Sequence, residues 1–148
     1  MKASRLIFTP LLASRVAVVQ LVAQQIKADQ RPIEDVKKKA EAGDAESQVE
    51  LGLRYDTGKG MPKDQVEAAS WYRKAAEQNY PAAQYILALC FQSGDGVAKD
   101  WVEAYKWLLL AMKEGYGHAK NDMTELESKL AQEQIADGQK RARAFKPR

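Results

Sequence analysis

Few residues in this 148-residue chain could perform chemistry. Cys90 is the only cysteine and His118 the only histidine, so the sequence offers no internal disulfide and no Cys/His cluster for zinc. A cysteine and a histidine can act as nucleophile and base, but no family signature of such an enzyme surrounds them, and no Gly-x-Ser-x-Gly motif is present. The sequence therefore predicts no catalytic residue, no metal ion and no cofactor.

Two Gly-x-Gly stretches are the other candidates for chemistry, because glycine-rich loops can bind phosphate through backbone N–H groups. They are Gly58-Lys59-Gly60 and Gly94-Asp95-Gly96. Both lack the third glycine, the preceding strand and the Lys-Ser/Thr pair of a nucleotide-binding loop. A tight turn between helices is the favoured interpretation, in which at least one glycine of each pair has a positive φ.

Both glycine stretches lie in a duplicated segment. Residues 46–81 align with residues 82–117 at a constant offset of 36, and thirteen of the 36 pairs are identical. The identical pairs include the loop glycines and two tryptophans, Trp71 and Trp107. Internal repeats with a period of about 20 to 50 residues indicate stacked, solenoid-like architectures.

The second half of each repeat predicts an amphipathic helix. Asp64 and Asp100 stand at its start as N-caps, each with a glutamate three positions later, as in a capping box. Apolar residues then recur at i, i+3, i+4 and i+7, the pattern of a buried stripe. Because Trp71 and Trp107 lie at equivalent positions of this stripe, we expect both to be buried in equivalent environments. No segment of the repeat alternates like a strand.

The first half of each repeat predicts a helix with two different faces. One face repeats its apolar residues, whereas the other changes from charged to apolar between the copies. Packing between units demands a repeated surface, but recognition does not, and first helices usually line the concave face of such stacks. We therefore expect a partly accessible protein-binding surface formed by Leu53, Arg54, Ile86, Leu89 and Cys90. The alternative is that the N-terminal segment or an adjacent unit covers these side chains.

The overall composition fits one soluble globular domain, with 45% hydrophobic and 29% charged residues. The net charge of +3 is mild and does not predict nucleic-acid binding, which needs a concentrated basic face. The basic residues near the C-terminus lack interleaved aromatic residues, and a solvated tail is the favoured interpretation.

Residues 1–30 fit either a signal peptide or an N-terminal helix. Residues 1–28 contain no acidic residue, and two apolar runs flank Arg15. A secretory signal peptide cut after Ala23 would give a secreted or periplasmic protein, although Arg15 interrupts its apolar region. An organelle presequence is a third option, and an uncleaved helix implies a cytoplasmic protein. The interrupted run is too short to predict a membrane span.

The two copies read ELGLRYDTGKGMPKDQVEAASWYRKAAEQNY and ILALCFQSGDGVAKDWVEAYKWLLLAMKEGY. Their period, glycine loop, aspartate and tryptophan resemble the Sel-1-like repeat family, whose signature is ALGxxYxxGxGV…D…A…WYxKAAEQG. The tail EQIADGQKRARAF is similar to the closing helix of many members, so the resemblance covers about residues 36–145. The tetratricopeptide repeat, with a period of about 34 residues, is the weaker match.

The resemblance implies an all-α, α/α superhelical solenoid in a bacterial protein that acts as a non-enzymatic scaffold or adaptor and binds a protein or peptide in its groove. The implied domain covers residues 31–148, with a partial repeat at 33–45, repeats at 46–81 and 82–117, and capping helices at 118–146. Two alternatives stay open. One is an enzyme-like role in cell-wall or β-lactam chemistry, by analogy with a cysteine-rich branch whose disulfides this chain cannot form. The other is a purely structural homo-oligomerisation module.

Overall fold

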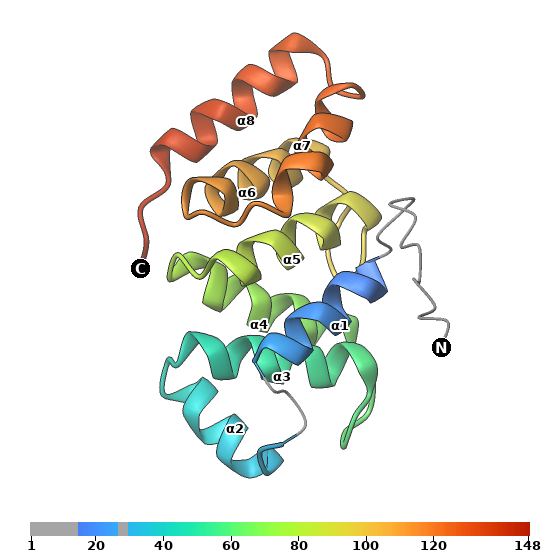
Figure 1. Cartoon of the computed structure of the whole chain (residues 1–148), viewed down its shortest axis with the longest axis vertical. Coiled ribbons are helices and arrows are strands. Elements are labelled where there is room, and N and C mark those ends of the chain that lie inside the picture. Colours follow the sequence, from blue (N-terminus) through green and yellow to red (C-terminus); the bar gives the residue numbers. More distant parts are fainter. Residues whose placement is uncertain (1–14, 27–29) are drawn as a thin grey trace, which may run out of the picture.

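The computed structural model describes residues 15–26 and 30–148, and the predicted all-α solenoid is confirmed over these ranges, which contain no strand. Residues 1–14, which hold the first part of the predicted signal peptide or helix, lie outside the described residues. The helices stack one above another from α2 to α8, while α1 crosses the stack (Figure 1). Their bounds are α1 (Arg15–Gln25), α2 (Ile33–Glu41), α3 (Ala45–Thr57), α4 (Gln65–Glu77), α5 (Pro81–Ser93), α6 (Trp101–Lys113), α7 (Ala119–Glu127) and α8 (Gln132–Ala144).

Each predicted repeat is a helical hairpin. Helices α3 and α4 form the first repeat, α5 and α6 form the second, and each helix packs against the next along the chain from α2 to α7. Helix α8 returns to pack against α6 and closes the stack. One hydrophobic cluster runs from α1 through both repeats to α8, and a smaller cluster joins α2 to the start of the first repeat.

The glycine loops end the first helices, as predicted. Gly58 and Gly94 are the C-caps of α3 and α5, with φ of 73° and 82°. Gly60 and Gly96 also have positive φ, at 76° and 70°, which only glycine adopts at little cost. Gly96 has a second role, because a Cβ atom there would lie 1.9 Å from the carbonyl oxygen of Gln65. The second loop therefore packs directly on the backbone of the first repeat.

The predicted N-caps are confirmed, but the capping-box interpretation is wrong. The carboxylates of Asp64 and Asp100 accept the backbone N–H groups two and three residues later. In a capping box, the glutamate would accept the N–H of the capping residue. Here that N–H donates to the preceding helix instead, from Asp64 to the Tyr55 carbonyl at 2.8 Å and from Asp100 to the Phe91 carbonyl at 2.9 Å. One such bond in each hairpin joins the start of the second helix to the first helix.

A repeated glutamine joins consecutive units, which was not predicted. The Gln48 amide donates to the Ala40 carbonyl at 3.1 Å, and the Gln84 amide donates to the Ala76 carbonyl at 3.3 Å. Both carbonyls lie in the last turn of the preceding second helix, where four carbonyl groups lack intrahelical partners. Each carbonyl also accepts a backbone N–H, from Gly43 or Asn79, so the identical pair Gln48/Gln84 adds a second donor that ties each unit to the preceding helix end.

The last unit departs from the repeat pattern in its first helix, α7, and is followed by α8, which packs back on α6. Glu127 stands where the repeats carry Tyr55 and Phe91, and its carboxylate accepts a hydrogen bond of 2.7 Å from the Tyr105 hydroxyl. Phe145, just after α8, packs edge-on against Trp107 with the ring centroids 5.5 Å apart. Both contacts attach the last unit to α6.

The two tryptophans are not equivalent, so that prediction was wrong. Trp107 is 1% exposed, between its own repeat and the C-terminal segment that carries Phe145. Trp71 is only partly buried and packs against the small cluster around Val36. The reason is that the two second helices have different neighbours: α8 packs against α6, whereas α4 has its main contacts with α3 and α5 alone.

Candidate protein-binding groove

The predicted binding residues are buried, and Leu53, Ile86, Leu89 and Cys90 belong to one hydrophobic cluster. Leu53 and Arg54 are on α3, and Ile86, Leu89 and Cys90 are on α5. The most exposed of the five is Arg54, at 8% of its surface. The expectation that they are partly accessible was therefore wrong, and the alternative of a covering N-terminal segment is what the structure shows. We call the surface that these five residues form the first-helix groove.

Helix α1 covers this groove. It packs against α5 and α3, and Figure 1 shows it lying across both helices. Val18, Val19 and Val22 are its buried residues and belong to the same hydrophobic cluster as Leu53 and the three groove residues of α5. Ala23 and Ile26 are partly buried against that cluster. These five residues recur at i, i+1, i+4, i+5 and i+8 and therefore lie on one side of the segment, although the exposed side also carries an apolar residue, Leu21.

The central helix α5 is enclosed on all sides. Every residue from Ala82 to Phe91 is buried, and the helix contains no charged side chain. A helix that is apolar all round is a buried helix. Helices α4 and α6 cover two of its sides and α1 covers a third, so neither of its faces is available as a free surface while α1 is in place.

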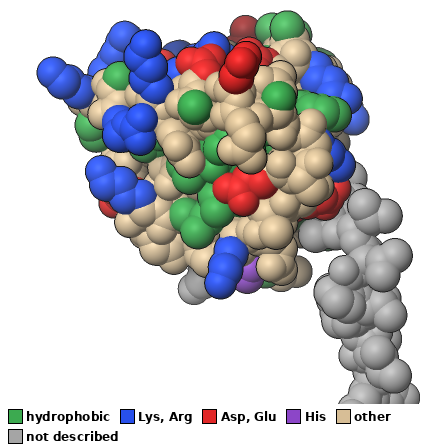
Figure 2. All heavy atoms as spheres, turned by 90° about the horizontal axis from the view of Figure 1, so that it is seen from above, with side chains coloured by type: hydrophobic (Ala, Val, Ile, Leu, Met, Phe, Trp, Pro, Cys, Tyr) green, Lys and Arg blue, Asp and Glu red, His purple; other side chains and the backbone are tan. Residues whose placement is uncertain are grey.

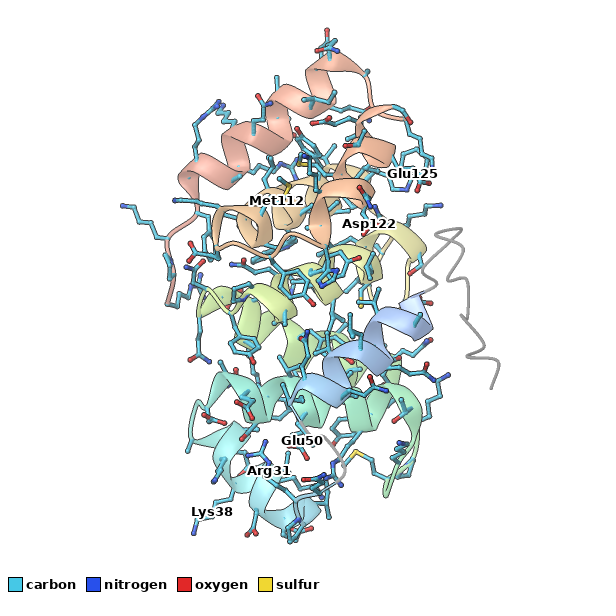
Figure 3. The ribbon with its side chains drawn as sticks, in the orientation of Figure 1. Arg31, Lys38, Glu50, Met112, Asp122 and Glu125 are labelled. Carbon is cyan, nitrogen blue, oxygen red and sulfur yellow. The ribbon has the colours of Figure 1, made fainter. Side chains whose placement is uncertain are left out.

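In the first repeat, the groove contains a buried ion-pair network instead of apolar side chains alone. Glu50 is fully buried and receives two arginines: Arg54 donates to its carboxylate at 2.8 Å, and Arg31 donates through Nε at 2.7 Å. Arg54 also donates to the backbone carbonyl of Arg31 at 2.7 Å. Arg31 and Glu50 face each other near α2 in Figure 3. This network fixes the chain that follows α1 onto α3.

The network was not predicted, yet the repeat alignment contains a signal for it. Glu50 and Arg54 are spaced i, i+4 on one helix face, the spacing of an ion pair. At an offset of 36 their equivalents are Ile86 and Cys90, which are apolar. The same two positions therefore bind the chain after α1 in the first repeat and, in the second, belong to the hydrophobic cluster that also contains the valines of α1.

Two cavities lie outside the groove. A cavity of about 330 Å³ lies between α6 and α8, with Leu109, Leu110 and Ala142 among its lining residues. A cavity of about 180 Å³ between α5, α6 and α7 is lined in part by Trp101 and Asp122. Neither holds a metal-binding constellation, since the described residues contain no group of three His, Cys, Asp or Glu side chains suited to a metal ion.

The carboxylate of Asp122 is engaged by the protein. The Tyr85 hydroxyl of α5 donates to it, and burial raises the pKa of Asp122 above its ordinary value. Glu125, one turn later, pairs with Lys129 at 2.6 Å. Figure 3 labels both acids, on α7. The bond to Tyr85 joins α7 to the second repeat, whereas the pair of Glu125 and Lys129 is local to the end of α7, so both acids have a structural role.

The basic residues of α8 and the C-terminal tail are exposed. Seen from the α8 end, most Lys and Arg side chains lie along the left edge of the molecule and others lie at the right edge and the bottom (Figure 2). Arg141 is bound within the protein, donating to Glu103 at 2.8 Å and to Asp137 at 2.7 Å. Within residues 15–26 and 30–148, no helix combines the length and the apolar character needed to cross a membrane.

Comparison with known proteins places these features in a family. The model of the Sel1 repeat matches residues 45–80 and 81–116, one residue before the repeats that the sequence predicts. A Sel1 repeat protein from Oxalobacter formigenes has a similar structure, with a TM-score of 0.63 and 33% identity over 76% of this chain and 89% of that chain.

Two Escherichia coli proteins are also similar. The structure of a protective antigen of uropathogenic strains, which displays an SLR fold, matches with a TM-score of 0.75 and 29% identity over 90% of this chain and 30% of that chain. The secretory immunoglobulin A-binding protein EsiB is 46% identical over 43 residues, which is 29% of this chain and 9% of EsiB. The chain thus spans less than a third of either relative. From its two matched repeats and its likeness to nearly all of the O. formigenes protein, the chain belongs to the Sel1 repeat family.

Proposed function

We propose that this protein is a non-enzymatic scaffold that binds a helical segment of a protein partner in the first-helix groove. The observation that carries the proposal is that a helix, α1, already packs there through its apolar stripe. An amphipathic helix laid into an apolar groove is a common mode of peptide recognition. Sel1 repeat proteins generally mediate protein–protein interaction, which supports a protein as the partner.

The predicted binding residues keep a place in this proposal, with altered roles. Leu53, Ile86, Leu89 and Cys90 form the apolar floor that contacts a bound helix. Arg54 does not contact the partner, because its guanidinium holds the chain near Arg31 through Glu50. EsiB is named for binding secretory immunoglobulin A. That name supports a protein as the class of partner and nothing more specific.

The test is binding of a defined helix in trans. The probe is a fluorescently labelled peptide with the sequence of residues 15–26, and the receptor is the full chain carrying Val22→Asp, which weakens the resident helix. Fluorescence anisotropy should give saturable binding. The same peptide with aspartate in place of Val22 is the matched control and should bind at least about tenfold more weakly, since burying a valine contributes about 1.5–3 kcal/mol. Absence of binding up to about millimolar peptide, the concentration range of a tethered ligand, would contradict the proposal.

A further inference from the structure

We infer that the partner helix carries an uncharged aliphatic stripe, and that α1 is an intramolecular competitor which this helix displaces. The inference rests on the proposed function and specifies both the chemistry of the partner and the control of its access. Three features support it: the composition of the floor, the neutralisation of Arg54, and the way in which α1 is held.

The floor of the groove selects against charge. Helix α5 supplies Ile86, Leu89 and Cys90 and has no charged residue along its length. A carboxylate or ammonium group pressed onto this surface would lose its hydration without gaining a partner, which is strongly unfavourable. Val18, Val19 and Val22, the residues now buried there, define the side chains that fit. A partner therefore needs aliphatic residues at i, i+1 and i+4.

The positive net charge of the chain does not make this groove a receptor for acidic peptides. Arg54 is the only basic residue among the five that form the groove, and it already donates to Glu50 and to the Arg31 carbonyl. Recruiting it to an acidic ligand would break a buried ion pair and the hydrogen bond to the Arg31 carbonyl. Selection by shape and apolarity thus outweighs selection by charge.

Helix α1 is held in a way that permits exchange. It has 11 residues, below the length of about 12–15 at which isolated helices become stable in water, so its helical state depends on the groove. Its described groove-facing side chains are all hydrocarbon, and apolar contacts are non-directional, so another aliphatic helix can replace them. The chain is fixed separately at Arg31, five residues after Ile26. Release of α1 therefore leaves the Glu50 network intact.

The covalent link between α1 and the rest of the chain determines how strongly α1 competes with a free helix. A segment joined by a short linker acts at an effective concentration on the order of millimolar. A free peptide identical to α1 must compete with that concentration, so its apparent Kd on the native chain approaches about 1 mM. If the same peptide binds the emptied groove with a Kd of about 10 µM, displacement of α1 should improve its apparent affinity about 100-fold.

The experiment compares the native full chain with two variants of α1. Val22→Asp places a charge on the fully buried position and should release the helix, whereas Leu21→Asp makes the same kind of change at a residue that is 38% exposed. The double variant Val19→Ala, Val22→Ala weakens the same contacts without a charge, in case Val22→Asp lowers the overall stability. Circular dichroism confirms that the repeats stay folded.

Cys90 reports directly on the position of α1, because it is the only thiol and it is buried in the groove. Its reaction with a thiol reagent should accelerate at least about tenfold in Val22→Asp and stay at the native rate in Leu21→Asp. Native-rate reaction in both Val22→Asp and the double alanine variant would overturn the inference, since α1 would then not be displaceable.

Peptide binding gives the second measurement, with the labelled peptide of residues 15–26 and versions carrying aspartate or lysine in place of Val22. We expect tight binding to Val22→Asp, binding at least about tenfold weaker to the native chain and to Leu21→Asp, and loss of binding for both charged peptides. Equal affinity for all three chains would overturn the competition and leave the proposed function standing. Retained binding of the aspartate peptide would overturn the aliphatic selectivity. A reactive Cys90 with no peptide binding would refute the proposed function itself.

Discussion

Trp107 and Trp71 occupy the same position of the repeat, yet they should contribute unequally to stability. Trp107 is 1% exposed, packs edge-on against Phe145 and has the Lys106 ammonium 4.3 Å from its ring centroid. Trp71 is partly buried, with the Lys74 ammonium 3.6 Å from its ring centroid. Substituting each by alanine therefore separates the effect of burial from that of sequence position.

Truncation of a fully buried large aromatic residue lowers the free energy of unfolding by about 3–5 kcal/mol, through lost transfer free energy and the cavity that remains. We expect this loss for Trp107→Ala. For Trp71→Ala we expect about 1–2 kcal/mol, from partial burial together with a cation–π contact worth about 0.5–1 kcal/mol at an exposed site. The two losses should thus differ by about 1–4 kcal/mol.

Urea unfolding followed by far-UV circular dichroism measures the difference. With an m value of about 2 kcal/mol/M, Trp107→Ala should lower the midpoint by about 2 M and Trp71→Ala by about 0.5–1 M. Combining Trp107→Ala with Phe145→Ala should reveal a coupling of about 0.5–1.5 kcal/mol, the range for an aromatic pair. Equal midpoint shifts for the two tryptophan variants, or the absence of coupling to Phe145, would refute the explanation that the C-terminal segment carrying Phe145 buries Trp107.

Three further predictions concern single side chains. Glu50→Ala should lower the free energy of unfolding by about 3–5 kcal/mol because it leaves two arginines without their carboxylate, whereas Glu125→Ala, from an exposed pair, should lower it by less than about 1 kcal/mol. Gly96→Ala should destabilise far more than Gly60→Ala in thermal unfolding, since both have positive φ but only the first would meet backbone, at 1.9 Å. Asp44→Ala should cost about 1 kcal/mol at pH 7, the usual value of an N-cap. The hydrogen bond from the Ser47 hydroxyl lowers the pKa of Asp44, so the stability that this carboxylate contributes is present above about pH 4 and is lost as the pH falls through the lowered pKa. The stabilities of this variant and of the native chain should therefore approach each other as the pH is lowered below about 4.

The parts of the fold that could be predicted are those fixed by local geometry. A chain that reverses between two helices within a few residues needs glycine with positive φ, and it needs an aspartate to accept the first N–H groups of the next helix. Because both copies meet the same demand, Gly58 and Gly94 recur, as do Asp64 and Asp100, and each was predicted correctly. The solenoid follows from these repeated hairpins.

The parts that could not be predicted depend on contacts between distant segments. The exposure of Trp71 depends on how α2 packs, and that of Trp107 on Phe145, 38 residues later. The burial of the groove depends on α1, whose stripe of Val18, Val19 and Val22 has helical spacing that a signal peptide shares. Periodicity identifies the helix but does not specify the surface against which it packs.

The changing face of the first helices has a physical explanation in the N-terminal segment. Divergence between the copies was interpreted as a surface for an outside partner. In the structure, Glu50 and Arg54 of the first copy bind the chain at Arg31, and their equivalents Ile86 and Cys90 of the second copy belong to the cluster that receives α1. The two copies diverge because one segment passes over both and presents a charged residue to the first and an aliphatic helix to the second. This face therefore already binds a segment of its own chain, and that contact is the precedent for the outside helix that we propose.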